Sequence, residues 1–378
     1  MKPKIIIIIL SALFVIFLIV LLFQNNEEHV QINNPITPYE EYNYGESDKI
    51  IDIGIQPLWI PTNIICEVIK RDLILKDVLD KMGMELRFHN YLKGADVNNY
   101  ILKGELEAGI GGDMPAITIS AEYDILIPVL IQHGFTSIVS KQHMVINELE
   151  GHKIAYAFGS NAHYALLIAL YSAGLTENDV KLIPMDISEM PRALNSGKID
   201  AFSAWEPIPS IAVLSQDGSN YVIIHKKNST GYMYFTEDFA SNFPEAVNQI
   251  VAAEIRAIKW LQSHNKYLSE AVQWAVETGE AELNVKYDLT SEEYSALAEQ
   301  DLIGMKSIPL IPEMFLQEGG NLYNQFIFLK ELNKIPETST WDKVFNSFDR
   351  KIVIEVISNP HKYIINTFNY NTDVDKYE

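Results

Sequence analysis

Polar residues stand at the joint between a predicted strand and a predicted helix, in the stretch "KIAYAFGSNAHYALLIALYSAGL". Ser160 is a residue type that caps a helix, and Gly174 is a type that ends one. The first turn of a helix presents unpaired backbone N–H groups and the positive end of the helix dipole, which suit a sulfonate, a nitrate or a carboxylate. We therefore predict that Ser160 and Asn161 contact an anionic ligand. Capping alone would also explain Ser160.

A similar joint occurs in two stretches that are built alike, "LKGELEAGIGGDMP" and "LNSGKIDAFSAWEP". Each has a helix end with a glycine, an apolar-acidic-alanine signature, a short predicted strand, and then Gly112-Asp113 or Trp205-Glu206. Two such units about ninety residues apart indicate two similar lobes. Because ligands of open α/β sheets bind beyond the carboxyl ends of strands, both pairs are candidate ligand contacts.

Each candidate has a functional and a purely structural interpretation. Gly112 lets a ligand approach the backbone, whereas Asp113 before Met-Pro also has the form of a helix cap. Trp205 can cover an alkyl chain. Glu206 can pair with an amine if it faces the ligand, or cap its helix if it does not.

Two further candidates complete the predicted ligand site. Gln56 ends the first predicted strand and offers an amide donor and an acceptor, although it can also be a loop residue in solvent. His163 lies in the first turn of its helix, where it can donate a hydrogen bond to a ligand, fix the turn, or face solvent.

The sequence lacks the motifs of the common enzyme classes. It has no G-x-S-x-G, H-E-x-x-H or phosphate-loop pattern, and Cys66 is its one cysteine. The histidines His133, His143 and His152 lack the spacing of a helical metal site. We therefore predict that the chain is not an enzyme and has no catalytic residue, metal site or cofactor.

Composition and the first residues bear on location and partners. Fifty acidic against 29 basic residues give a net charge of -21, which argues against nucleic-acid binding. Lys2 and Lys4 precede an apolar run from Ile5 to Phe23, long enough to cross a membrane. We predict an uncleaved transmembrane helix over residues 1–23, a linker over 24–47, and an extracytoplasmic body; a signal peptide cut at an atypical site is the alternative.

Strands and helices alternate along the body of the chain. "KIIDIGIQPLW" is typical of a strand, "IPTNIICEVIKRDLILKDVLDKMG" has helical spacing that ends at Gly83, and "MELRFHNY" is typical of a second strand. This alternation predicts an α/β fold with parallel strands.

With these stretches in view, the chain resembles the solute-binding proteins of ABC importers for nitrate, taurine and aliphatic sulfonates, a family that includes thiamine-precursor binders. The resemblance covers roughly residues 49–350 and rests on blocks in the family's order: "IGIQ", "GELEAGIGGDMPAI", "LEGHKIAYAFGSNAHYALLIALYSAGL", "LNSGKIDAFSAWEP" and "FTEDFASNFPEAVNQIVAAEIRAIKWL". "GSNAHY" is most similar to the Gly-Ser-Ser-Ala-His-Tyr turn of the sulfonate branch. Many members have a hydroxyl residue where this chain has Gly111, which leaves the ligand's identity open.

The resemblance implies a two-lobe periplasmic-binding-protein type II fold with two crossover strands, in "TSIVSKQHMVI" and "TGYMYFTED". It implies a first lobe over residues 48–140 and 236–350, a second lobe over 141–235, and a C-terminal extension over 351–378 that is a strand or an apolar helix with a loose polar end. The implied function is capture of a small oxyanion-bearing solute for an ABC permease and its ATPase. A solute sensor, or a binder of nitrate or of a thiamine-precursor-like pyrimidine, is the alternative.

Overall fold

A computed structural model describes residues 39, 42–45, 47, 49–214, 221–283, 289–299 and 309–372. The chain divides into Met1–Asn43 and Tyr44–Glu378, and the fold below is that of the second unit. The predicted membrane helix and nearly all of the predicted linker lie outside the described residues. Among the helices that are described, none has both the length and the hydropathy needed to span a membrane.

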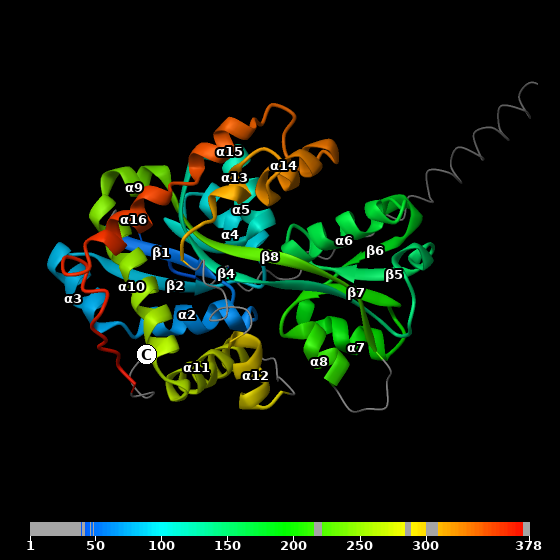
Figure 1. Cartoon of the computed structure of the whole chain (residues 1–378), viewed down its shortest axis with the longest axis horizontal. Coiled ribbons are helices and arrows are strands. Elements are labelled where there is room, and N and C mark those ends of the chain that lie inside the picture. The colour runs from blue at the N-terminus through cyan, green and yellow to red at the C-terminus, as the bar shows by residue number, and fades with distance from the viewer. Residues whose placement is uncertain are drawn as a thin grey trace, which may run out of the picture. The chain divides into compact units, whose positions relative to one another are not determined.

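Eight strands form one mixed sheet in the order β2-β1-β3-β8-β4-β7-β5-β6. Two of them, β4 and β8, are 16 and 15 residues long and pair with each other in antiparallel fashion. In Figure 1 they run from the group around β1 and β2 to the group around β5, β6 and β7. The strands are β1 Ile50–Ile55, β2 Glu85–Asn90, β3 Ala108–Gly112, β4 Ile125–Ser140, β5 Lys153–Tyr156, β6 Lys181–Pro184, β7 Ala201–Trp205 and β8 Val222–Thr236.

The two long strands lie in the middle of the sheet and divide it into two half-sheets. In the first half-sheet, β1, β2 and β3 are parallel, and β3 pairs antiparallel with the last residues of β8. In the second half-sheet, β5, β6 and β7 are parallel, and β7 pairs antiparallel with the last residues of β4. Because β4 and β8 run in opposite directions, these pairings turn the carboxyl ends of both parallel sets toward the middle of the sheet.

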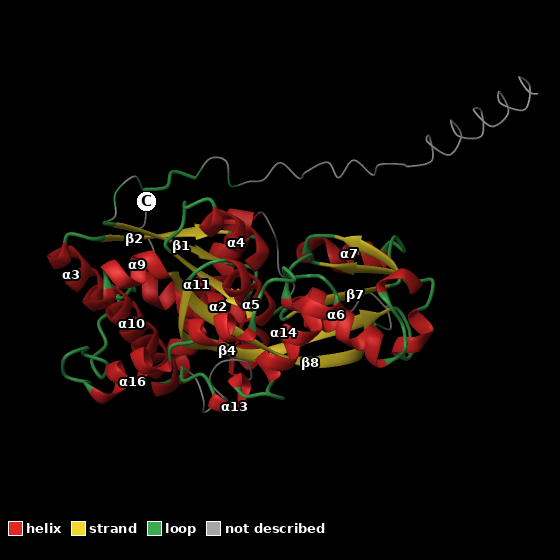
Figure 2. Ribbon diagram, turned by 90° about the horizontal axis from the view of Figure 1, so that it is seen from above, coloured by secondary structure: helices red, strands yellow, loops and turns green. Residues whose placement is uncertain are grey.

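Helices cover both faces of the sheet (Figure 2). In Figure 1, α4 and α5 lie above the first half-sheet and α2 below it, whereas α6 lies above the second half-sheet and α7 and α8 below it. The helices are α2 Ile60–Lys70, α3 Leu73–Met82, α4 Gly94–Leu102, α5 Asp113–Glu122, α6 Asn161–Ser172, α7 Met190–Asn195, α8 Ile208–Leu214, α9 Glu237–Asn242, α10 Pro244–Ser263, α11 Asn265–Leu283, α12 Ser291–Ala298, α13 Glu313–Leu316, α14 Asn321–Glu331, α15 Trp341–Ser347 and α16 Arg350–Ser358.

The helix predicted over residues 60–83 is two helices, α2 and α3. The break falls at Asp72, whose side chain accepts hydrogen bonds from the backbone N–H groups of Ile74 and Leu75 at 2.9 and 3.1 Å and so begins a new helix. The predicted end at Gly83 is confirmed, since this residue has a left-handed φ of 69°.

The crossing strands are longer than the predicted stretches. β4 begins at Ile125, before "TSIVSKQHMVI", and ends at Ser140, before the last residues of that stretch. β8 begins at Val222, before "TGYMYFTED". Each strand pairs with the other over nearly its whole length, and this pairing, which the local sequence does not encode, sets the bounds. The proposed lobe boundaries remain predictions.

The expectation of a loose C-terminal end is wrong for residues 359–372. Residues 350–358 form α16, which packs against α10 and β4. After it, Tyr363 and Ile365 are fully buried, and the backbone N–H of Asn371 donates to the carbonyl of Arg71 at 3.0 Å. The segment is thus anchored to α10 and to the junction between α2 and α3.

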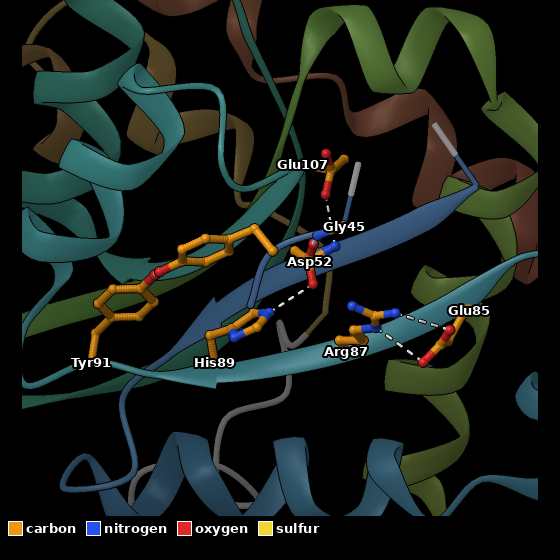
Figure 3. Close-up of polar contacts among 8 residues, drawn as sticks. Gly45, Asp52, Glu85, Arg87, His89, Tyr91 and Glu107 are labelled. Carbon is orange, nitrogen blue, oxygen red and sulfur yellow. Dashed lines mark hydrogen bonds and ion pairs between the residues drawn. The ribbon is translucent and has the colours of Figure 1, made fainter. Parts of the chain in front are cut away.

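A buried carboxylate on the first strand joins three segments (Figure 3). Asp52 accepts a hydrogen bond from the backbone N–H of Gly45 at 2.6 Å and lies 2.6 Å from Nε2 of His89 on β2. Its own backbone N–H donates to Oε2 of Glu107 at 2.7 Å. Burial, together with the nearby charge of Asp52, raises the pKa of Glu107 to about 7.

The pKa of Glu107 predicts a pH dependence of stability. Because the native carboxyl holds its proton up to about pH 7, whereas an unfolded glutamate loses it near 4.5, the native state binds more protons between these values. The free energy of unfolding is therefore expected to fall as pH rises through this window. Glu107→Gln should remove this part of the decline in urea unfolding series at several pH values. The exposed Glu85→Gln should keep it, and equal slopes in wild type and Glu107→Gln would contradict the prediction.

Candidate functional site

The carboxyl ends of strands from both half-sheets meet at one small cavity, which buried residues line. Its volume is about 10 Å³, roughly the room for one water molecule. The lining residues follow or end β1, β3, β5 and β7, or begin helices next to them: Gln56, Trp59, Gly94, Gly112, Pro115, Ser160, Asn161 and Trp205. The structure thus brings together five of the predicted site residues, and leaves Asp113, His163 and Glu206 off the cavity wall.

The first half-sheet contributes Gln56 and Trp59 to the wall. The Gln56 side chain donates from Nε2 to the carbonyl of Ile110 on β3 at 2.8 Å, which fixes its amide at the ends of the two strands. Trp59 packs against β8 at Gly231, where a Cβ would come within 2.5 Å of the ring atom Cη2. Glycine at this position therefore allows the indole to approach the crossing strand closely.

Ser160 caps its helix, as its residue type predicts. Its Oγ accepts from the backbone N–H of His163 at 3.4 Å and donates to the carbonyl of Ala157 at 2.6 Å. Gly159 before it has a left-handed φ of 71°, which turns the chain from β5 into α6. The hydroxyl is therefore engaged within its own turn, although Ser160 also lines the cavity.

Asn161 projects from the start of α6 toward the first half-sheet. Its Oδ1 accepts from the backbone N–H of Met114, at the start of α5, at 3.1 Å. Its Nδ2 donates to the carbonyl of Thr230 on β8 at 3.2 Å. One buried side chain thus connects helix starts on the two sides of the cavity.

Trp205 ends β7 and offers a hydrogen-bond donor in the cavity wall. Its side chain is buried, and its Nε1 has no hydrogen-bond partner among the residues that the structure describes. A buried indole N–H without a partner is costly, and a ligand acceptor would remove that cost.

Asp113 does not line the cavity but holds together elements that do. It is fully buried, and its carboxylate accepts from the backbone N–H groups of Met114 at 2.8 Å and Thr230 at 3.3 Å and from Nε2 of Gln325 at 3.1 Å. Burial raises its pKa, while the Lys227 cation and these three donors oppose that rise. Asp113 therefore ties α5 to β8 and α14, and it is the first residue of α5, not the residue before it.

Glu206 faces the helix that follows it, which is the second of its two predicted alternatives. Its Oε2 accepts from the backbone N–H of Ser210 in α8 at 3.2 Å, and the side chain is buried. Burial raises its pKa.

His163 lines a different cavity. Its Nδ1 accepts from the backbone N–H of Gly159 at 3.3 Å, and its ring packs against Tyr156 and Phe158. Burial lowers its pKa to about 3, so the ring is neutral and carries its proton on Nε2. This second cavity, of about 450 Å³, lies between α4, α5 and the turn before α6 and also has Lys334 in its wall.

Three residues around the first cavity fall outside the predicted site: Gly94, Pro115 and Thr230. Gly94 allows α4 to approach α5, since a Cβ there would lie 2.6 Å from Cγ of Pro115. The signal available in the sequence was a glycine that begins a helix soon after a strand. Thr230 contributes through its backbone, which residue type does not reveal.

Candidate groups for metal binding or nucleophilic chemistry are few in the described ranges. These residues contain no group of three or more His, Cys, Asp or Glu side chains placed to hold a metal ion. Cys66 is buried in α2, and burial raises the pKa of its thiol, which keeps the thiol protonated and unreactive.

Curated proteins similar in sequence are described as binding proteins. A putative aliphatic sulfonates-binding protein of Bacillus subtilis is 27% identical over 57% of this chain and 66% of its own length. The corresponding Escherichia coli protein is 29% identical over 35% and 43%, and the E. coli taurine-binding periplasmic protein is 24% identical over 46% and 57%. The chain thus spans less than two thirds of the length of these relatives.

Solved structures share the fold. The alkanesulfonate-binding protein SsuA from Xanthomonas axonopodis pv. citri, bound to MOPS, matches with a TM-score of 0.60 at 14% identity, over 78% of this chain and 97% of that one. The periplasmic nitrate-binding protein NrtA from Synechocystis PCC 6803 matches with a TM-score of 0.61 at 12% identity, over 85% and 92%. The predicted periplasmic-binding-protein architecture is therefore confirmed for the described part of the chain.

The family itself is identified by a match over residues 76–276, which is more than half of the chain. This region contains β3, β7 and the starts of α5 and α6, which contribute most of the cavity wall, whereas Gln56 and Trp59 lie before it. The chain belongs to the NMT1-like family.

Proposed function

We propose that this chain is the extracytoplasmic solute-binding component of an ABC importer. Its solute is a small organic molecule with an oxyanion group, such as an alkanesulfonate or taurine, bound in the cavity between the two half-sheets. The observation that carries the proposal is the convergence, at one buried point, of the starts of α5 and α6 with the indole N–H of Trp205. The sequence relatives described as sulfonate- and taurine-binding proteins support the choice of solute.

The mechanism that we propose is closure of the two lobes on the solute. The helix starts supply backbone donors and the favourable end of the dipole, which a chain of net charge -21 needs because its overall field repels anions. The crossing strands β4 and β8 connect the lobes and are the natural hinge. The closed form would then be presented to the permease, with the chain held at the membrane by residues 1–23.

A sensor that signals through a partner chain is the second candidate function, and nitrate or a thiamine-precursor-like pyrimidine are alternative solutes. The nitrate-binding protein among the similar structures favours keeping nitrate in the screen. Genes for an importer ATPase and permease beside this one would favour transport over sensing.

The test is a thermal-shift screen of the full-length chain in a mild detergent. Its compounds are alkanesulfonates, taurine, nitrate, bicarbonate, phosphonates and pyrimidines. A compound present at about 100 times its dissociation constant should add about 2.7 kcal/mol to the free energy of unfolding. If none of these compounds shifts the transition, the proposed function is wrong.

Trp205→Phe provides a prediction for the site. This substitution keeps an aromatic ring in the cavity wall and removes the N–H, so a hydrogen bond to an anion, worth about 1.5–3 kcal/mol, is lost. The dissociation constant of the compound found in the screen should rise roughly 10- to 100-fold. Trp341→Phe on α15, outside the cavity, is the control. An unchanged affinity in Trp205→Phe would place the solute elsewhere.

A further inference from the structure

Asn161 forms part of the wall of the small cavity, and its side chain reaches from α6 to the opposite half-sheet. The Asn161 carboxamide lies at the start of α5, where it accepts the Met114 N–H at 3.1 Å and donates to the Thr230 carbonyl at 3.2 Å. About 10 Å³ remains, which is too little for any organic solute. A solute group that accepts a hydrogen bond from the Met114 N–H must therefore displace the Asn161 carboxamide from it.

Gly112 is the residue that makes this position possible. A Cβ at residue 112 would lie 2.1 Å from Oδ1 of Asn161 and 2.2 Å from its Cγ and Nδ2. The side chain of Asn161 therefore rests directly on the backbone at the end of β3. This fit links a residue of α6 to a residue of the opposite half-sheet, across the line along which the lobes close.

A donor in the same wall is left without a partner in this arrangement. Asn161 engages Met114 and Thr230, but no described residue accepts from Nε1 of Trp205, whose side chain is only 4% exposed. Asn161 therefore does not satisfy the Trp205 N–H, and a ligand acceptor would remove the cost of burying this donor without a partner.

We propose that Asn161 is an internal latch that holds the two lobes closed without solute, and that the solute's acceptor group displaces it from the Met114 N–H. The proposal rests on the proposed function, and it adds that closure does not require the solute. A latch of this kind lowers the apparent affinity, because the solute binds only the fraction of molecules in which the latch is released.

The latch itself can be tested without any solute. Fluorophores on Lys81→Cys and Lys181→Cys, two exposed positions on α3 and β6, report the separation of the lobes by energy transfer in the full-length chain. The buried thiol of Cys66 leaves the labels on the introduced cysteines. Asn161→Ala should shift the solute-free chain toward lower transfer, and Asn242→Ala, at an exposed asparagine on α9, should not. Equal transfer in wild type and Asn161→Ala would overturn the latch.

Gly112→Ala tests whether the effect of Asn161 on lobe separation depends on its contact with Gly112. Alone, it should lower energy transfer as Asn161→Ala does, because the added Cβ meets the carboxamide. In the Asn161→Ala background it should cause no further change, because the colliding group is gone. An effect of the same size in both backgrounds would show that Gly112 acts independently of Asn161, contrary to the proposal.

Affinity separates the latch from the proposed function. With the compound found in the thermal-shift screen as probe, Asn161→Ala should bind roughly 5- to 150-fold more tightly, since two hydrogen bonds no longer compete. Weaker binding would mean that Asn161 holds the solute and would overturn the latch. If no compound binds wild type or variant, the proposed function fails, while the energy-transfer result still decides for or against the latch.

Discussion

Replacing Arg256 by methionine is expected to lower the free energy of unfolding by about 3–5 kcal/mol. Arg256 lies in α10 with a fully buried side chain, and its Nε donates to Oδ2 of Asp72 at 2.7 Å. Its Nη1 donates to the carbonyl of Tyr363 at 2.9 Å. Removing the guanidinium leaves the Asp72 carboxylate buried without its counter-charge, and it removes the hydrogen bond that ties the segment after α16 to α10.

The measurement is urea unfolding of the full-length chain, with two comparisons. Lys76→Ala removes an exposed ion pair with Asp80, which is expected to cost no more than about 0.5 kcal/mol. Combining Arg256→Met with Asp72→Asn should recover part of the loss, because asparagine can still cap α3 and carries no charge. A cost below about 1 kcal/mol for Arg256→Met would contradict this account of the pair.

The local sequence was sufficient to predict the elements whose ends are marked by capping residues. Ser160 and Gly83 mark a helix start and a helix end in the structure where their residue types predict them. Asp72 caps a helix in the same way, but the apolar periodicity continues on both sides of it, and periodicity alone predicts a single helix. A capping residue inside a periodic segment is the sequence signal that marks this break.

Long-range pairing could not be predicted from local pattern. The bounds of β4 and β8 follow from their pairing with each other, and the anchoring of residues 359–372 follows from Arg256 and Arg71, more than a hundred residues earlier in the chain. In the same way, Asp113 has the sequence form of a helix start, yet its carboxylate is fixed by Thr230 and Gln325. Residue type predicts what a side chain can bind but does not predict which of its possible partners the fold brings near.

The candidate site shows this limit most clearly at Asn161. The sequence places an amide at a helix start, from which a ligand contact is a reasonable prediction. The structure adds that Met114 and Thr230 already engage this amide and that Gly112 makes room for it. Whether such a group binds the solute or competes with it depends on distances across the cavity, which the order of residues along the chain does not contain.

Replacing Glu254 by methionine is expected to raise the free energy of unfolding at pH 8 by about 1–3 kcal/mol, in the opposite direction to Arg256→Met. Glu254 and Arg256 lie two residues apart on α10, and both are fully buried. Arg256 has Asp72, whereas neither carboxyl oxygen of Glu254 has a hydrogen-bond partner within the described part of the chain. Burial raises the pKa of Glu254 well above its ordinary value near 4.5.

The sign of the pH dependence follows from that direction. The native carboxyl keeps its proton at pH values where the unfolded one has lost it, so wild-type stability declines as pH rises above about 4.5. The gain from Glu254→Met should therefore be small at pH 4.5 and larger at pH 8 in urea unfolding. Glu107 contributes a decline of the same sign, but it is present in both proteins and cancels in their difference. Glu254→Gln, which keeps the shape and cannot ionise, should lose the same pH dependence. If Glu254→Met is less stable than wild type at pH 8, the Glu254 carboxylate stabilises the native state. That result would contradict the prediction that burial without a partner makes it destabilising.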